Sequence, residues 1–451
     1  MTEPRELTDQ DFEPAGLDAL DGTAHVFLTG RAGTGKSTLI NHWIRTRGRG
    51  GRTLTCAPTG IAALNAGGVT IHQLIHAGPD VTPERAAAEG RRRAGEPLYR
   101  ILDTLVIDEV SMLRADLADS LDRFLKGARR SRQPFGGIRL IMVGDLAQLP
   151  PVVTKEDGKR FDGGEWDGPW FFQSHAVQTI LDDNRLQGVE LTRAHRQTDR
   201  AFLDALDDMR DGHPAPGTLA MLNRRAGAPW NPLDTTVICA RNDTVNQINR
   251  MMLQRLPGPH ATRRASVAGD WPQRLEPAPY WLDMRPGMRV MLTSNDADGR
   301  WANGTMGTLT DMDPQGWWAT VRPDADDTEE YTVKPHSWTR TRPTTWEDPE
   351  TGEERIILEE TGRYTQLPIR PGWAFSIHKS QGQSVGRLRV DLGARLFSPG
   401  QAYVALSRAR DYNHLSLSRP LTAADVFADP DAIAFLEKIR HATPVTQDTL
   451  F

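Results

Sequence analysis

A glycine-rich turn near the start of the chain constrains its fold more than any other segment. Residues 30–37 read GRAGTGKS and match the pattern G-x-x-x-x-G-K-S/T. An apolar run at residues 25–29 comes directly before the turn, and a helical pattern at residues 38–45 follows it. In this context the pattern is a P-loop, which joins a strand to a helix. The sequence therefore predicts an α/β fold with a parallel sheet.

The residue types of this turn suit a nucleoside triphosphate and its metal ion. Glycines let successive backbone amides face the phosphates, and the N-terminus of the following helix adds a favourable dipole. We expect Lys36 to reach the β- and γ-phosphates and Ser37 to bind Mg²⁺. The residues expected to bind ATP in this turn are Gly30, Ala32, Gly33, Thr34, Gly35, Lys36, Ser37 and Thr38. A chance match in a loop is the alternative, and the flanking strand and helix argue against it.

Chain length and the order of apolar runs predict two α/β domains. A chain of 451 residues exceeds what one hydrophobic core usually serves. Short β-like runs alternate with helical stretches up to about residue 250, and a second set begins there and resumes near residue 373. The expected strands are residues 25–29, 53–57, 104–107 and 139–143 in the first set, and residues 236–240, 373–377 and 388–392 in the second. We expect a first domain at 1–185, with a short polar insertion at 76–97, a second at 186–257 and 369–451, and an inserted small β-barrel at 258–368.

Composition excludes several classes of protein and of site. Hydrophobic residues make up 38% of the chain and charged residues 25%, which is typical of a soluble globular protein. No apolar run approaches the roughly 18 residues of a membrane span, and the acidic N-terminus is unlike a secretory signal, so we expect a cytoplasmic protein without a membrane partner. Cys56 and Cys239 are too few for a disulfide framework or a four-thiolate zinc site. With a net charge of −5, any nucleic-acid-binding surface must be a local cationic groove.

Two further apolar runs end in polar residues that suit ATP hydrolysis. Residues 105–109 read LVIDE and place two carboxylates at the end of a strand. Asp108 is expected to bind Mg²⁺, and Glu109 to act as the base that orients the attacking water. Residues 144–151 read GDLAQLPP, where Gln148 is placed to hydrogen-bond both the γ-phosphate and water. A solvated acidic turn and a surface glutamine are the alternatives.

The order of these motifs resembles that of superfamily 1 helicases. VIDEVSML, PFGGIRLIMVGDLAQLPPV, LTRAHRQ, AFSIHKSQGQSV and QAYVALSRAR follow one another between about residues 24 and 418. The sequence is most similar to the petite-integration-frequency (PIF) helicase family in group B of that superfamily, which is related to RecD and to the phage helicase Dda. The resemblance implies two RecA-like P-loop core domains, an SH3-like β-barrel inserted in the second and a short wedge insertion in the first. No wedge residue matches well enough to be named.

The resemblance also implies one contact with single-stranded DNA on each core domain. The matching residues are Pro58, Thr59, Gly60, Thr70 and His72 in the first domain, and His378, Lys379 and Ser380 in the second. Hydroxyl and imidazole groups suit contact with phosphate without choice of base, which a motor on DNA needs. His72 taken alone is equally consistent with a core histidine.

Four further residues are assigned to the nucleotide. Arg196 and Arg408 resemble the two arginines that reach the γ-phosphate from the second domain, and a planar guanidinium suits the oxygens of the transition state. Surface arginines are the alternative. The same resemblance assigns Gly382 to nucleotide binding. Gln10, upstream of the first strand, is a candidate for the adenine edge, and an exposed glutamine without a role is the alternative.

These features predict a monomeric, ATP- and Mg²⁺-dependent DNA helicase that moves 5′ to 3′ along single-stranded DNA and unwinds forked duplexes. The polarity comes from the resemblance alone. Three alternatives stay open: a RecD-like subunit of a helicase–nuclease complex, a DNA-stimulated ATPase that remodels protein–DNA complexes, and a DNA-independent P-loop kinase or transporter ATPase. The tryptophans of residues 258–368 are either core or base-stacking residues, and the run of arginines at 91–93 is either solvated or in contact with DNA at the fork.

Overall fold

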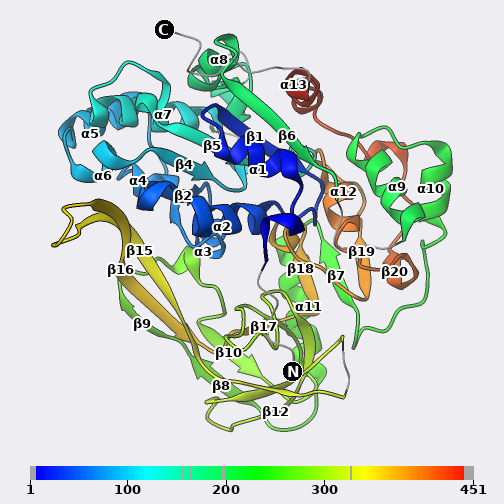
Figure 1. The fold of residues 1–451 in the computed structure, drawn as a ribbon. Helices are drawn as coiled ribbons and strands as arrows, with labels where there is room; N and C mark the ends of the chain where they lie inside the picture. The colour runs from blue at the N-terminus through cyan, green and yellow to red at the C-terminus, as the bar shows by residue number, and fades with distance from the viewer. Residues whose placement is uncertain (1–6, 155, 162–163, 194–198, 326–327, 441–451) are drawn as a thin grey trace. The chain divides into compact units, whose positions relative to one another are not determined.

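The chain forms two compact units, each with its own parallel sheet (Figure 1). A computed structural model describes residues 7–154, 156–161, 164–193, 199–325 and 328–440. The first unit comprises Met1–His195, Thr341–Glu360 and Pro430–Phe451, and the second comprises Arg196–Arg340 and Thr361–Asp429. Among the described residues, no helix is long and apolar enough to span a membrane.

The first unit is built on a six-stranded parallel sheet with the order β3-β2-β4-β5-β1-β6. Its strands are β1 (His25–Gly30), β2 (Thr53–Ala57), β3 (Val69–Thr70), β4 (Thr104–Ile107), β5 (Arg139–Val143) and β6 (Leu186–Leu191). Its helices are α1 (Pro14–Asp21), α2 (Lys36–Arg47), α3 (Gly60–Asn65), α4 (Ile71–Leu74), α5 (Pro83–Arg92), α6 (Pro97–Ile101), α7 (Ala115–Arg129), α8 (His175–Asp182) and α13 (Pro430–Arg440). The parallel α/β fold predicted from the sequence is confirmed.

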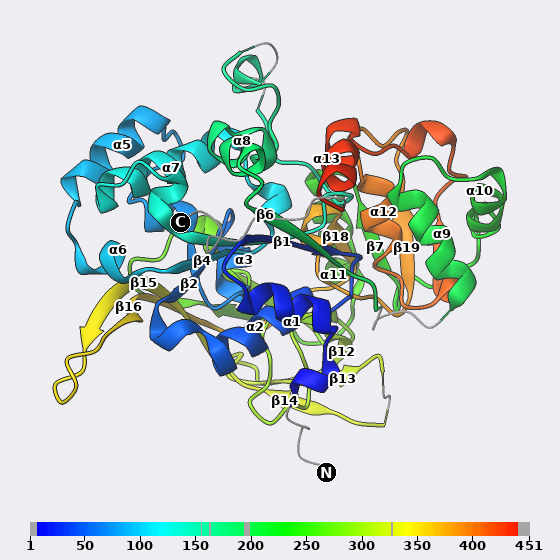
Figure 2. The same cartoon turned by 45° about the horizontal axis from the view of Figure 1, so that its top comes forward.

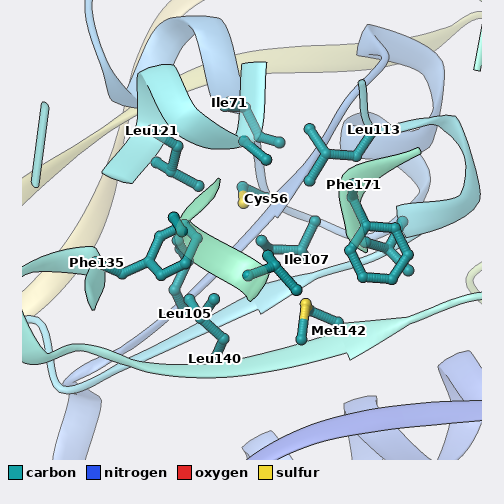
Figure 3. Packing of buried hydrophobic residues seen from close by; sticks show 14 of the residues in the cluster. Cys56, Ile71, Leu105, Ile107, Leu113, Leu121, Phe135, Leu140, Met142 and Phe171 are labelled. Atoms are coloured by element: carbon teal, nitrogen blue, oxygen red, sulfur yellow. The ribbon is translucent and has the colours of Figure 1, made fainter. Parts of the chain in front are cut away.

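Helices cover both faces of this sheet (Figure 2). Val26 and Leu28 pack in one apolar cluster with residues of α1 and α2, whereas Phe27 packs in another with residues of α7, α8 and α13. Figure 3 shows part of the second cluster, where Leu105, Ile107 and their neighbours meet Leu121 and Phe135. Because successive residues of a strand point to opposite faces, a strand covered on both sides needs a continuous apolar run. The apolar run before the P-loop meets this requirement.

Helix α13 packs in the first unit although it follows the second unit in sequence. The Phe435 ring stacks on Phe172 with centroids 4.4 Å apart and meets Phe27 and Phe171 edge-on. The sequence analysis placed residues 186–257 and 369–451 in the second domain. The structure instead assigns β6 and α13 to the first unit, because β6 pairs with β1 and α13 covers the Phe27 side of the sheet.

Phe435→Ala is expected to lower the free energy of unfolding of the first unit by about 3 to 5 kcal/mol, because the side chain is 5% exposed and packs against three other rings. Urea unfolding followed by tryptophan fluorescence measures the change. Phe397→Ala is the matched control, since Phe397 is 61% exposed and should change stability by less than about 0.5 kcal/mol. Equal, small effects of the two variants would contradict the packing of α13.

The second unit contains a four-stranded parallel sheet with the order β18-β7-β19-β20. Its strands are β7 (Thr236–Cys239), β18 (Ala374–Ser376), β19 (Leu388–Asp391) and β20 (Leu415–Leu417). Its helices are α9 (Arg200–Arg210), α10 (Pro216–Asn223), α11 (Asn242–Arg255) and α12 (Gln401–Leu406). The strands expected near residues 236, 373 and 388 are therefore present within one residue at each end.

Antiparallel β structure separates β7 and α11 from β18. Its strands are β8 (Ala261–Arg264), β9 (Ser266–Gly269), β10 (Trp281–Met284), β11 (Arg289–Leu292), β12 (Met306–Met312), β13 (Ala319–Pro323), β14 (Tyr331–Val333), β15 (His336–Glu347), β16 (Glu354–Gln366) and β17 (Ile369–Pro371). They form sheets of five, three and two strands, with the orders β14-β13-β12-β11-β17, β15-β16-β9 and β10-β8. β structure is present in the expected insertion at 258–368, but Thr341–Glu360, which include parts of β15 and β16, belong to the first unit. The SH3-like character of the insertion stays a prediction.

The tryptophans of this insertion differ in exposure. Trp281, Trp317 and Trp346 are exposed, and the other four that recur there are partly buried: Trp271, Trp301, Trp318 and Trp338. None of the seven is fully buried, although Trp301 packs against the apolar core of the insertion, so core and base-stacking roles both stay open.

The run of arginines at 91–93 lies at the end of α5. Arg92 and Arg93 both pair with Glu89, and Arg93 also pairs with Glu96. These ion pairs favour the interpretation of a solvated, locally neutralised charge run.

Candidate nucleotide and nucleic-acid sites

The predicted nucleotide-binding residues of the first unit gather at one edge of its sheet. The P-loop follows β1, Asp108 follows β4, and the segment with Gln148 follows β5. Leu28 pairs with Val143, and Ile107 pairs with Met142, so the three adjacent strands end together. Ligands of open α/β sheets bind at this carboxyl edge.

Glycines allow the P-loop to turn sharply between β1 and α2. Gly30 has a φ of +149°, and a Cβ atom there would lie 2.6 Å from the Leu191 carbonyl oxygen and 2.8 Å from Thr34 Oγ1. Gly35 caps the N-terminus of α2 with a φ of 81°. The Lys36 ammonium donates to the carbonyl oxygens of Gly30 at 2.7 Å and Arg31 at 3.0 Å. The loop therefore holds a cation at its centre.

A hydroxyl and a carboxylate face each other beside the P-loop. Ser37 Oγ lies 3.5 Å from Asp108 Oδ2, and the Glu109 amide donates to Asp108 Oδ1 at 2.9 Å. Burial raises the pKa of Asp108, and the Glu109 amide, Lys36 and Ser37 oppose this shift. Oxygen donors of this kind suit Mg²⁺. Ser37 and Asp108 are therefore the residues that would hold the ion. Within the described residues, no group of three or more His, Cys, Asp and Glu side chains is placed to hold a metal ion.

The backbone at Glu109 is in the left-handed region, with φ 52° and ψ 43°. A non-glycine residue rarely adopts this conformation, and such strain concentrates at functional sites. It turns the chain directly after the strand that carries Asp108. Glu109, which is predicted to orient the attacking water, therefore lies where the chain turns sharply.

Gln148 is held in place by an acid that the sequence analysis did not single out. Gln148 Nε2 donates to Asp145 Oδ2 at 3.4 Å, and the Gln148 amide donates to the Asp145 carbonyl oxygen at 3.1 Å. Asp145 is 1% exposed and Gln148 8%. The sequence signal that could have indicated this contact is Asp145 itself, an acidic residue three positions before Gln148. The two side chains form one buried polar pair at the end of β5.

Gln10 lies exposed in the short 3₁₀ helix Asp9–Asp11. Asp9 Oδ1 lies 2.8 Å from His42 Nε2 of α2, and Arg47 of α2 also contacts Asp9. The turn that carries Gln10 is therefore fixed to the helix that begins in the P-loop. The sequence analysis missed the contact between Asp9 and His42, because nothing in the spacing pairs them.

The predicted DNA-binding residues of the first unit lie at the ends of β2 and β3. Ala57 pairs with Thr70, which brings the Pro58–Gly60 turn next to Thr70. The Thr59 hydroxyl accepts from the Ala62 amide, and the Thr70 hydroxyl accepts from the Gln73 amide, so each caps a short helix. His72 is half-buried rather than enclosed in the core.

The predicted DNA-binding residues of the second unit follow β18. His378 and Lys379 are exposed in the 3₁₀ helix His378–Ser380. Ser380 is 1% exposed, and its hydroxyl donates to the Ile377 carbonyl oxygen at 2.8 Å. The Ser380 side chain therefore stabilises the turn in this structure rather than facing solvent. Gly382 is exposed, with a φ of 76°.

Arg408 is enclosed in the second unit. Its guanidinium is 0% exposed and donates to the carbonyl oxygens of Ser380 at 3.2 Å, Gln383 at 3.3 Å and Val404 at 2.9 Å, and to Ser407 Oγ at 2.8 Å. It thus joins the end of α12 to the loop that carries His378 and Lys379. Arg196 lies outside the described residues.

Comparisons with known proteins show the family to which this chain belongs. The family model described as PIF1-like helicase matches residues 18–216. An ATP-dependent DNA helicase Pif1 from Bdellovibrio bacteriovorus is 30% identical over 437 residues, which cover 94% of this chain and 91% of that protein. This chain belongs to the PIF1-like helicase family.

Some family members are longer. The chain is 31% identical to the ATP-dependent DNA helicase PIF1 of Danio rerio over 97% of its own length but spans 65% of that protein. Among solved structures, Bacteroides sp Pif1 in complex with ADP-AlF4 has a TM-score of 0.81 at 28% identity, covering 97% of this chain and 98% of that one. The same Bacteroides helicase in complex with ADP-AlF3 and single-stranded DNA has a TM-score of 0.61 at 30% identity, with the same coverage of both chains.

Proposed function

We propose that this chain is an ATP-dependent DNA helicase that couples ATP hydrolysis to movement along single-stranded DNA and to unwinding of forked duplex DNA. The observation that carries the proposal is the convergence of Lys36, Asp108 and Gln148 at the carboxyl edge of one sheet. The names of the relatives and the nucleotide and DNA in the Bacteroides complexes support it.

In the proposed reaction, each polar residue at the carboxyl edge of the first sheet has a separate role. Lys36 neutralises the β- and γ-phosphates, and Ser37 and Asp108 hold Mg²⁺, which supplies charge neutralisation at the phosphates when bound. Glu109 orients the attacking water, and Gln148, fixed by Asp145, hydrogen-bonds the γ-phosphate and reports its loss. The oxygen donors of Ser37 and Asp108 support the choice of Mg²⁺. Gln10, on its anchored turn, is proposed to contact the adenine edge.

The DNA contacts are proposed on both units. Pro58, Thr59 and Gly60 with Thr70 and His72 would hold the strand from the first unit, and His378 and Lys379 from the second. Motors of this kind contact phosphates rather than base edges, so binding should tolerate changes of DNA sequence. Two DNA contacts, one on each unit, make stepping possible. We propose that Arg196 and Arg408 act on the γ-phosphate and that the protein acts as a monomer.

ATP hydrolysis is expected to rise strongly when an oligothymidine is added, and a duplex with only a 5′ single-stranded tail is expected to be unwound. A duplex with only a 3′ tail should stay intact, because the resemblance implies 5′ to 3′ movement. Steady-state ATPase assays measure the stimulation of hydrolysis, and gel-based assays with the two tailed substrates measure unwinding. Stimulated hydrolysis without unwinding would indicate a remodelling ATPase, and hydrolysis indifferent to DNA would contradict any DNA motor.

A further inference from the structure

Two cations lie close together beside the predicted DNA contact of the second unit. Arg370 lies in β17, and Lys379 lies in the 3₁₀ helix that follows β18. Arg370 pairs across the sheet with Met291 of β11, and Met291 packs against Phe375 of β18. Because paired residues of antiparallel strands share a face, the Arg370 side chain leaves its sheet on the side of Phe375. Phe375 precedes Lys379 by four residues.

Neither cation is neutralised by a residue in the described part of the chain. Among the described residues, the Arg370 and Lys379 side chains make no hydrogen bond and no ion pair. Burial lowers the pKa of both groups, and the charge of Arg370 lowers that of Lys379 further. No carboxylate contributes to either shift. Tyr364 lies near Arg370, but its hydroxyl donates to the Ala278 carbonyl oxygen.

Such an arrangement is unfavourable for the protein alone. A partly desolvated cation without an anionic partner, next to a second cation, lowers stability. Groups of this kind are found where a ligand of opposite charge completes the site. The ligand must therefore be an anion that accepts hydrogen bonds from a guanidinium and an ammonium.

We propose that Arg370 binds a backbone phosphate of single-stranded DNA together with Lys379, and so extends the DNA contact of the second unit from one loop to a neighbouring strand. The inference rests on the proposed function. A phosphate diester fits because it presents oxygens to the planar fork of Arg370 and to the compact charge of Lys379 at once. Exposed His378, next to Lys379 in the chain, adds a third group suited to phosphate.

The test is the salt dependence of single-strand binding without nucleotide, measured by fluorescence anisotropy with a labelled oligothymidine. Each phosphate contact adds about 0.7 to the slope of log affinity against log salt. Arg370→Gln is expected to weaken binding about tenfold at low salt and to reduce the slope by about 0.7. Arg370→Lys keeps the charge and should keep most of the slope. Arg387→Gln is the matched control, because Arg387 is exposed in the same unit and pairs with Asp234.

Thermal unfolding separates a binding role from a structural one. Because Arg370 makes no bond within the described protein, Arg370→Met should melt at or above the temperature of the parent while binding DNA more weakly. A lower melting temperature with an unchanged salt slope would overturn the proposal and make Arg370 a structural residue. A parent protein that fails to bind oligothymidine would instead overturn the proposed function, and parent-like slopes for Arg370→Gln would overturn this inference alone.

Discussion

Turnover of the Arg408→Ala variant is expected to fall by about 10³- to 10⁵-fold at saturating single-stranded DNA, a loss of roughly 4 to 7 kcal/mol of transition-state stabilisation. The expectation follows from the proposed action of Arg408 on the γ-phosphate, for which its guanidinium must leave the oxygens of its own unit that it contacts in this structure. Interactions made only in the transition state act on kcat more than on ground-state binding. ATP affinity should therefore stay within about tenfold of the parent value.

The structure adds a second effect of the same substitution. Alanine would remove the guanidinium donor from the partly buried Gln383 carbonyl oxygen and one of two donors from the buried Ser380 carbonyl oxygen, which keeps the Gln383 amide. A buried acceptor that loses its donor costs about 1 to 3 kcal/mol, and these acceptors belong to the loop after His378 and Lys379. Single-strand affinity should weaken by up to about tenfold even without nucleotide. An arginine that acts only on the γ-phosphate would leave that affinity unchanged.

A lysine at position 408 is not expected to restore turnover. The ammonium of Arg408→Lys keeps a charge but has no planar fork, so it cannot serve four acceptors on separate segments. We expect its kcat to be closer to that of the alanine variant than to the parent. Steady-state kcat and nucleotide-free DNA affinity of both variants test the assignment. Turnover within a few-fold of the parent would place Arg408 outside the reaction.

ATP hydrolysis by the Lys36→Ala variant is expected to fall by at least about 10²- to 10³-fold, because no other cation is expected to take over its contact with the β- and γ-phosphates. The Lys36 ammonium already lies on the carbonyl oxygens of Gly30 and Arg31, within the loop that would enclose those phosphates. Single-strand affinity should be largely unchanged, since the proposed DNA contacts lie on other loops.

The control for Lys36→Ala is Lys126→Ala. Lys126 lies on α7 and pairs with Asp122, away from the P-loop, and its loss should leave hydrolysis near the parent rate. ATPase rates and anisotropy of a labelled oligothymidine measure the two properties. A folded Lys36→Ala protein that lost DNA affinity together with hydrolysis would show that the two sites are not separable.

The elements that carry the proposed nucleotide site were predictable because their patterns are local in sequence. The P-loop lies in one run of eight residues, and the strands before Asp108 and Gln148 are short apolar runs whose ends carry polar residues. The predicted strands of the first sheet at 53–57, 104–107 and 139–143 agree with β2, β4 and β5 at both ends. Local patterns determine these elements, so the sequence alone was sufficient.

Contacts between distant segments were not predictable in the same way. Nothing in the pattern of α13 indicates that Phe435 packs against Phe27 and Phe172 rather than in the second unit. The four acceptors of Arg408 are mostly backbone oxygens, which every sequence has. Asp145, which holds Gln148, and Asp9, which holds the turn of Gln10 to His42, depend on chain directions that spacing does not specify.

The position of α13 affects how the protein is completed during synthesis. Translation proceeds at about 5 to 20 residues per second, so roughly 10 to 50 s pass between the emergence of β6 and that of α13 from the ribosome. During this interval the rings of Phe27, Phe171 and Phe172 lack the cover of Phe435. The nascent first unit therefore keeps this apolar surface without its native cover until α13 has been synthesised.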